Sequence, residues 1–293
     1  MRWSELESMH DPSNELRTSS LCATLGLEIV GIDLRRDTGP ELTAALAPLL
    51  YEHAVLCIRD QELSPQDLAR FGESLGRPVQ HNEEDLRLDG LPGVMSLSNA
   101  DDRDDRQMNG GAHWHTDLVH SDEPASFTML HAVDVPDAGG GTLFANQVMA
   151  CRSLPADRLE QAERTTVIHC YEGRTDGSVP EFRHPLVRRH PVTGRKALYA
   201  AADTGIGIVG LADEEAQPVL AEFAHHATQA RFVYRHAYRP NDVVIWDNAQ
   251  LLHRGERLER AHDAVTRRVM HRVSVRGWPR IDLDPADAVS DQS

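Results

Sequence analysis

Two residues in the segment HWHTD, residues 113–117, together with one distant histidine, constrain the fold of this chain most. His115 and Asp117 are two residues apart, so on an extended strand their side chains would emerge on the same face, roughly 6–7 Å apart. His253, in the segment WDNAQLLHRG, follows 136 residues later (253 − 117). A site built from all three requires a closed or two-sheet antiparallel architecture that brings distant strands together.

The composition of this set indicates one kind of metal chemistry. Two imidazoles and one carboxylate hold a metal ion on one face and leave its other coordination positions open, which is typical of non-haem Fe(II) oxygenases. The plainer interpretation of His115 and Asp117 is a solvated polar face of a strand. His113 would share that face. We expect it to support the site or line its pocket, because a third protein nitrogen would occupy a position that oxygen chemistry needs.

The length and charge of the chain narrow its class. The 293 residues suit one large domain, residues 1–293, with flexible tails at 1–20 and 281–293. Acidic residues outnumber basic ones by 46 to 30, and the net charge of −16 argues against nucleic acid or an anionic membrane as partner. No run of some twenty apolar residues exists and no signal-peptide core is visible, so we expect a cytoplasmic protein. The four cysteines, Cys22, Cys57, Cys151 and Cys170, are scattered, and we expect them to be reduced.

The apolar periodicity predicts many short strands with a few helices. Strands are expected at 25–34, 54–58, 127–135, 166–171 and 242–248, a hairpin at 184–202, and helices at 40–53, 65–75, 153–164 and 211–229. Ser64 and Pro65 form a favourable helix start, and Gly76 suits the end of that helix. The polar segments 99–111 and 172–184 are predicted loops. Either is a candidate lid over the metal, although 99–111 is equally explained as a solvated charge run.

The segment RRVMHRVSV, residues 267–275, alternates in strand fashion near the end of the chain. Arg268, Met270 and Arg272 share one face of this strand. Guanidinium groups on an interior face need anions, and their planar fork suits carboxylates. A structural ion pair is the alternative for either arginine.

At this point the chain resembles a known family. It is similar to the taurine dioxygenase/2,4-dichlorophenoxyacetate dioxygenase family of Fe(II)- and 2-oxoglutarate-dependent enzymes, from about residue 25 to residue 277. The residues that carry the resemblance are WHTD (114–117), GGGTLF (139–144), HPLVRRHPVTGRKALY (184–199), NDVVIWDN (241–248) and RRVMHR (267–272). Each piece alone is weak, whereas the set in this order is specific.

The resemblance implies a fold and a set of roles. The fold would be mainly β with flanking helices, a double-stranded β-helix or jelly roll, and this also suits the strand pattern. His115, Asp117 and His253 would hold Fe(2+), with 2-oxoglutarate and O2 as co-substrates. Thr142, which we would otherwise consider an ordinary strand residue, and Arg268 would bind the distal carboxylate of 2-oxoglutarate.

The substrate side of the site is less defined. Arg272 matches the position at which taurine dioxygenase-like members bind the anionic group of the substrate. His81 lies in a segment that reaches the substrate in similar proteins, and a plain surface histidine is the alternative. The spacing from His253 to Arg268, fifteen residues (268 − 253), is longer than in taurine-type members. An inserted loop, RGERLERAHD (254–263), explains it and weakens any prediction of taurine itself.

The leading hypothesis is therefore a dioxygenase that hydroxylates a small anionic substrate and forms succinate and CO2. An alternative within the same chemistry is desaturation, epimerisation or oxidative decarboxylation of an amino-acid-derived intermediate. The carboxylate of Asp117 disfavours halogenation, because similar halogenases have a small residue there that leaves room for chloride. A non-catalytic metal-binding sensor is the alternative from another class, and the combination of the three ligands with Arg268 disfavours it. By resemblance only, we expect a homo-oligomer.

Overall fold

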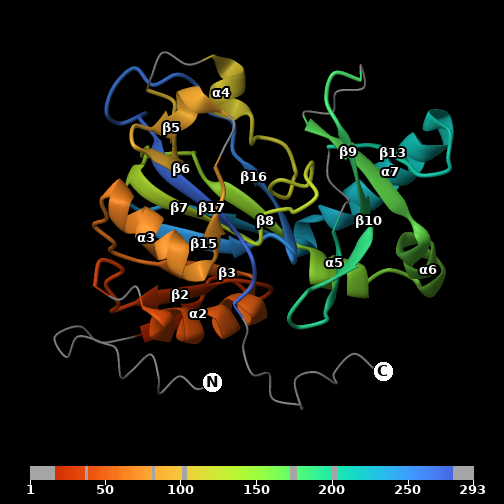
Figure 1. The fold of residues 1–293 in the computed structure, drawn as a ribbon, viewed down its shortest axis with the longest axis horizontal. Coiled ribbons are helices and arrows are strands. Elements are labelled where there is room, and N and C mark those ends of the chain that lie inside the picture. The colour runs from red at the N-terminus through yellow and green to blue at the C-terminus, as the bar shows by residue number, and fades with distance from the viewer. Residues whose placement is uncertain are drawn as a thin grey trace.

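Antiparallel β-structure forms the centre of the molecule (Figure 1). The computed structural model describes residues 17–36, 39–80, 83–100, 104–171, 177–199 and 204–279. The large sheet has nine strands, in the order β1 (Arg17–Ser20), β2 (Leu27–Val30), β3 (Val55–Ile58), β15 (Val243–Asp247), β7 (Phe127–Asp134), β17 (Val269–Arg276), β6 (Leu91–Ser98) and β5 (Arg87–Leu88), with β4 (Arg77–Pro78) also paired to β17. A second sheet has the order β14 (Val233–His236), β8 (Thr142–Asn146) and β16 (Leu251–Gly255).

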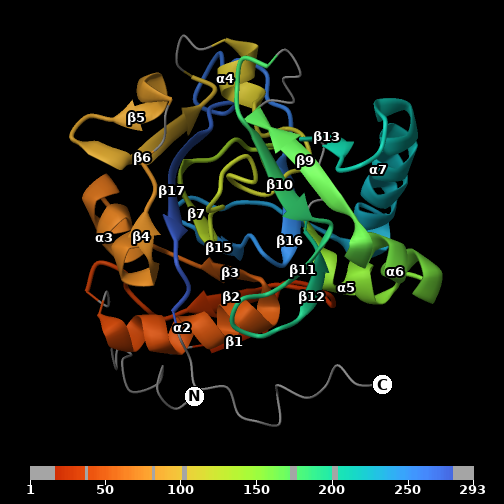
Figure 2. The ribbon, with the colours of Figure 1, turned by 45° about the vertical axis from the view of Figure 1, so that its right-hand side comes forward.

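Smaller elements surround these two sheets. A three-stranded sheet has the order β10 (Glu181–Pro185), β9 (Thr166–Cys170) and β13 (Gly205–Ile208), and β11 (Val187–Arg189) pairs with β12 (Lys196–Leu198). The helices are α2 (Pro40–His53), α3 (Pro65–Leu75), α4 (Asp105–Asn109), α5 (Gln147–Arg152), α6 (Ala156–Arg164) and α7 (Asp213–Ala227). Helices α2 and α3 lie on one side of the molecule, and α5, α6 and α7 lie on the other (Figures 1 and 2).

Strand β15 shows why the large sheet is covered on both faces. Val243 and Ile245 belong to the apolar cluster that α2 and α3 cover, whereas Val244 and Trp246 belong to a cluster shared with the small sheet. Successive side chains on a strand point to opposite faces, so an apolar run of this kind places one core on each side of the sheet. The two facing sheets form the double-stranded β-helix, or jelly roll, that the sequence predicts.

Several predicted elements are confirmed in detail. Helix α2 spans the predicted residues 40–53, and α3 begins at Pro65 with a reciprocal capping box between Ser64 and Asp67. The hairpin at 184–202 is the β11–β12 pair. The four cysteines are free. Within the described residues, no helix is long and apolar enough to cross a membrane.

Other predictions were wrong or incomplete. Residues 17–20 belong to strand β1 rather than to a flexible tail. Their side chains are exposed and the strand pairs with β2 through its backbone, so no apolar signal marks it in the sequence. Residues 1–16 and 280–293 lie outside the described residues. The predicted loop 172–184 contains most of β10, whose alternating exposure was hidden by its polar composition. The predicted loop 99–111 contains α4, which Asp104 caps. Helix α5, before the predicted helix 153–164, was missed.

Candidate active site

The structure brings His115, Asp117 and His253 together. One potential ligand atom from each lies within 4.8 Å of the others. His253 is on β16, and its backbone exchanges two hydrogen bonds with His115, at 3.0 and 2.8 Å, so that the two imidazole rings lie 4.2 Å apart between centroids. A pair of residues far apart in the sequence is thus fixed by the small sheet.

The predicted extended strand through HWHTD is wrong in one respect. Only His115 takes part in a β-bridge, and residues 117–120 form a turn in which Leu118 has a φ of 57°. Asp117 therefore reaches the site from the start of a turn and not from a strand face. The two-residue spacing suggested the correct proximity, but a different backbone conformation produces it.

A network of hydrogen bonds holds the carboxylate of Asp117. Thr128 donates to Oδ2 at 2.6 Å, and Nη2 of Arg272 donates to Oδ1 at 2.5 Å. Asn248 donates to Thr128 at 3.1 Å and accepts the backbone N–H of Asp117 at 3.2 Å. Thr128 and Asn248 were missed as site residues. The segment NDVVIWDN contains Asn248, but its role depends on a partner 131 residues away in the sequence, and no local signal reports that contact.

The protonation states suit metal binding. Burial lowers the pKa of His115 to about 4 and that of His253 well below its usual value, so both imidazoles are neutral at physiological pH. Burial opposes ionisation of Asp117, but the adjacent Arg272 and the two histidines outweigh it and hold the pKa of Asp117 below its usual value. Neutral imidazole and ionised carboxylate are the forms that bind a metal.

The backbone also sets the tautomer of one imidazole. Nδ1 of His115 lies 2.7 Å from the carbonyl oxygen of His113. A carbonyl can only accept, so Nδ1 carries the proton and Nε2, which lies 3.7 Å from Oδ1 of Asp117, keeps its lone pair for a metal. Nε2 of His253 lies 3.6 Å from Oδ2 of the same carboxylate. The donor set fits Fe(II), because two imidazole nitrogens and one carboxylate oxygen lie within 4.8 Å of one another.

Arg268 is buried and has no anionic partner among the described residues. Its Nε donates to the carbonyl of Gly140 at 2.8 Å and its guanidinium lies over the ring of Tyr238, 5.7 Å from the centroid. Burial lowers the pKa of Arg268, and among the described residues it forms no ion pair. Thr142 shares a 2.9 Å hydrogen bond with the Tyr238 hydroxyl. A buried guanidinium needs a counter-ion, and the distal carboxylate of 2-oxoglutarate would supply one. Tyr238 is a further residue that the sequence did not reveal.

The glycine turn before Thr142 makes room for Arg268. Gly140 has a φ of +70°, and a Cβ atom there would lie 3.0 Å from Cδ of Arg268. The backbone N–H of Gly141 donates to Glu256 at 2.9 Å, and Glu256 pairs with Arg235 through bonds of 2.5 and 2.8 Å. Glu256 comes from the predicted insertion 254–263, which therefore supports the turn.

The remaining predicted residues have different outcomes. Arg272 lies beside the triad of His115, Asp117 and His253, with 19% of its side chain exposed. Within the described residues its buried Nε has no hydrogen-bond partner. His113 packs beside the ring of His115 at 4.7 Å between centroids, as a neighbour of the triad. His81 lies outside the described residues.

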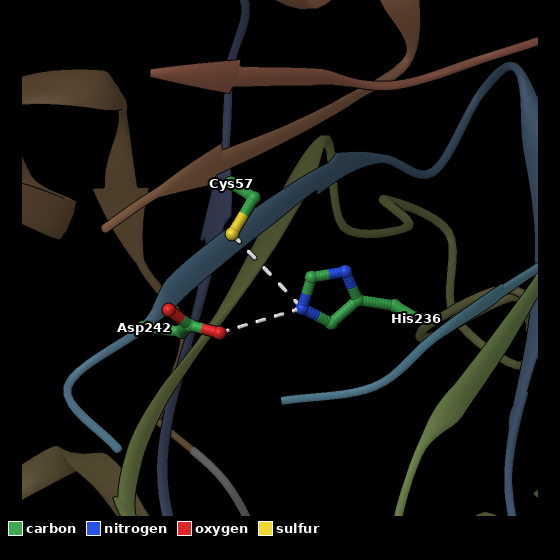
Figure 3. A group of neighbouring side chains, drawn as sticks. All are labelled: Cys57, His236 and Asp242. Carbon is green, nitrogen blue, oxygen red and sulfur yellow. Dashed lines mark hydrogen bonds and ion pairs between the residues drawn. The ribbon is translucent and has the colours of Figure 1, made fainter. Parts of the chain in front are cut away.

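A second group of potential ligands lies inside the jelly roll. Cys57, His236 and Asp242 are buried and point toward one another (Figure 3). Burial raises the pKa of the Cys57 thiol, which keeps it protonated. Asp242 already pairs with Arg59 at 2.5 Å and accepts a backbone N–H of Arg239 at 2.7 Å. Because metal binding requires a thiolate and a carboxylate free to coordinate, we interpret this group as a structural polar network.

Comparison with known proteins decides the family. The model of the family described as "Taurine catabolism dioxygenase TauD, TfdA family" matches residues 17–274. The chain belongs to this family. Among its relatives, the alpha-ketoglutarate-dependent 2,4-dichlorophenoxyacetate dioxygenase of Cupriavidus pinatubonensis is 33% identical over 267 residues, covering 83% of this chain and 91% of the relative. The alpha-ketoglutarate-dependent sulfate ester dioxygenase of Pseudomonas putida is 27% identical and covers 92% of both chains.

Solved structures of similar proteins have the same fold. A taurine dioxygenase from Burkholderia xenovorans superimposes with a TM-score of 0.77 at 27% identity, covering 94% of this chain and 99% of that one. AAD-2, solved with Mn(II) and N-oxalylglycine, gives a TM-score of 0.78 at 26% identity, covering 91% and 99%. This TauD/TfdA family member is an Fe(II)- and 2-oxoglutarate-dependent dioxygenase that uses O2.

Proposed function

We propose that this dioxygenase hydroxylates a small organic monoanion while converting 2-oxoglutarate to succinate and CO2. In this proposal His115, Asp117 and His253 hold Fe(II), and Thr142 and Arg268 hold the distal carboxylate of 2-oxoglutarate. Arg272 and His81, the latter outside the described residues, bind the substrate. The observation that carries the proposal is the guanidinium of Arg272 beside the triad, with donors to spare for an anion.

The protein residues position the reactants and exclude water. Asp117 and His253 are 2% and 5% exposed, so bulk solvent has little access to these two ligands. Thr128 and Asn248 fix the carboxylate of Asp117, and Trp246 packs against the ring of His253 at 4.7 Å. When bound, iron with 2-oxoglutarate and O2 supplies the oxidising chemistry. The chain contributes orientation of the substrate C–H bond toward the metal, through the anchor at Arg272.

Formal charges favour a substrate with a single negative charge. Fe(II) carries two positive charges, Arg268 and Arg272 one each, 2-oxoglutarate two negative charges and Asp117 one. One positive charge remains, and one substrate anion neutralises it. Glu256 does not enter this sum because Arg235 pairs with it. The names of the relatives agree with an anion, since they specify a phenoxyacetate, a sulfate ester and, in Saccharomyces cerevisiae, a sulfonate.

A paired substrate panel tests this function. Small carboxylates, sulfonates and sulfate esters are each incubated with the enzyme, Fe(II), 2-oxoglutarate and O2, beside their neutral amide, sulfone or ether counterparts. We expect succinate formation to depend on one or more anions and not on their neutral partners. The product should gain the mass of one oxygen atom, or break down after gaining it. Succinate formed equally with neutral partners would refute the role of Arg272. Loss of two hydrogens without added oxygen would show desaturation instead.

A further inference from the structure

The fold fixes the position of Arg272, the cationic side chain beside the proposed iron ligands. Nη2 of Arg272 lies 2.5 Å from Oδ1 of Asp117, and Nε2 of His115 lies 3.7 Å from the same oxygen. Arg272 is on β17, paired opposite Leu130 of β7 and Met95 of β6, in the middle of the large sheet. The guanidinium charge therefore stays close to the place where a divalent cation would bind.

The guanidinium is only partly used by this contact. An arginine side chain has five N–H donors. Among the described residues, Arg272 donates through Nη2 to Asp117, and its buried Nε has no hydrogen-bond partner. Asp117 is also engaged by Thr128 through its other oxygen. The guanidinium of Arg272 can therefore keep its contact with the carboxylate of Asp117 and still donate hydrogen bonds to a second anion.

We propose that Arg272 is shared between Asp117 and the anionic group of the substrate, and that it thereby couples substrate binding to metal binding. This inference depends on the proposed function. Without substrate, the guanidinium repels the metal ion and competes with it for Asp117. An anion on the guanidinium offsets that charge, so each ligand strengthens the binding of the other by the same factor.

Thr128 provides a matched comparison, because it donates to the same carboxylate without carrying a charge. Thr128→Val removes a positioning hydrogen bond, and loss of such a contact behind a metal ligand typically weakens metal affinity about 10- to 100-fold. Arg272→Met removes a hydrogen bond and a positive charge together. If charge dominates, we expect Arg272→Met to strengthen metal affinity, roughly tenfold, in the range of usual coupling factors. Arg272→Lys keeps the charge, and its metal affinity should remain close to that of the wild type.

The experiment measures Mn(II) affinity of the full chain by the electron paramagnetic resonance signal of free Mn(II). Saturating N-oxalylglycine occupies the Arg268 side of the site. Methanesulfonate serves as the monoanion, and dimethyl sulfone as its neutral isostere. In the wild type, methanesulfonate should tighten Mn(II) binding several-fold and dimethyl sulfone should not. In Arg272→Met, Mn(II) should bind more tightly at the outset and methanesulfonate should have no further effect.

Three results would overturn the coupling. Arg272→Met could bind Mn(II) as weakly as Thr128→Val, which would show that Arg272 only positions Asp117. Methanesulfonate could have no effect in the wild type, or act equally in the wild type and in Arg272→Met. If Mn(II) binds the wild type and any one of these results appears, the coupling fails while the proposed function stands. If the wild type does not bind Mn(II), both fail.

Discussion

At the scale of single residues, Arg268 is the side chain that we propose to bind the distal carboxylate of 2-oxoglutarate. Its guanidinium is buried, donates to the carbonyl of Gly140, lies over the ring of Tyr238 and has no carboxylate partner within the described residues. A charge-assisted hydrogen bond between a guanidinium and a carboxylate contributes about 1.5–3 kcal/mol. The interior position of Arg268 was predictable, because this arginine lies on the same strand face as Met270 and Arg272. Tyr238, which lies below it, was not predictable, because its ring and hydroxyl contacts join three segments distant in the sequence.

Arg268→Ala should raise the 2-oxoglutarate concentration for half-saturation by roughly 30- to 150-fold, since about 2–3 kcal/mol of carboxylate binding is lost. Arg267→Ala is the matched control. Arg267 is adjacent, and its half-exposed side chain pairs with Asp134 at the surface, so half-saturation should not change. Spectroscopic titration of the iron-loaded protein with 2-oxoglutarate, without oxygen, measures the half-saturating concentration in each variant. Equal effects of the two substitutions would contradict the assignment of the co-substrate carboxylate to Arg268.

At the scale of elements, helices and strands with regular apolar patterns were predicted well and the site segments were not. Helix α2 follows from its apolar spacing and α3 from its capping residues, which are local signals. HWHTD gave no such signal, because its conformation depends on a bridge to β16 and on a turn at residues 117–120. Strand β10 was missed because it is polar and pairs with β9 on a half-exposed sheet.

The turn before β8 gives a prediction at this scale. Gly139 and Gly140 have φ values of +79° and +70°, so alanine at either position should cost about 1–2 kcal/mol of folding stability. Only at Gly140 would the new methyl group contact Arg268. Gly140→Ala should therefore raise the 2-oxoglutarate requirement and Gly139→Ala should not, although thermal unfolding should show a loss of stability for both. An unchanged requirement in Gly140→Ala would indicate that the turn does not position Arg268.

At the scale of the whole molecule, buried neutral histidines should make the fold sensitive to acid. Burial lowers the pKa of His169 to about 3, and nearby His184 and His120 add to this shift. In the unfolded chain the pKa is near 6.5. Between these values only the unfolded chain binds the proton, so the stabilising contribution is complete above about pH 6.5 and is lost as the pH falls toward 3. Burial also lowers the pKa of His131 and His236, in the same direction.

The acid sensitivity is measured by urea unfolding of the metal-free protein at neutral pH and near pH 5. Each such histidine should reduce the free energy of unfolding by up to about 1.4 kcal/mol per pH unit below its unfolded pKa. His169→Gln should remove that share of the pH dependence, whereas His225→Gln, at an exposed position of α7, should leave it unchanged. A pH dependence that is the same in His169→Gln and in the wild type would contradict the burial of a neutral His169.

The central claim is that His115, Asp117 and His253 together would hold one ferrous ion, to which 2-oxoglutarate would bind as a chelating ligand. Anaerobic addition of Fe(II) and 2-oxoglutarate tests it most directly, through the visible charge-transfer band of the chelate. We predict this band in the wild type and in His113→Ala, which keeps the backbone carbonyl that orients His115. We predict its loss in His115→Ala, Asp117→Ala and His253→Ala. A band of normal intensity in all three ligand variants, with unchanged iron affinity, would contradict the account.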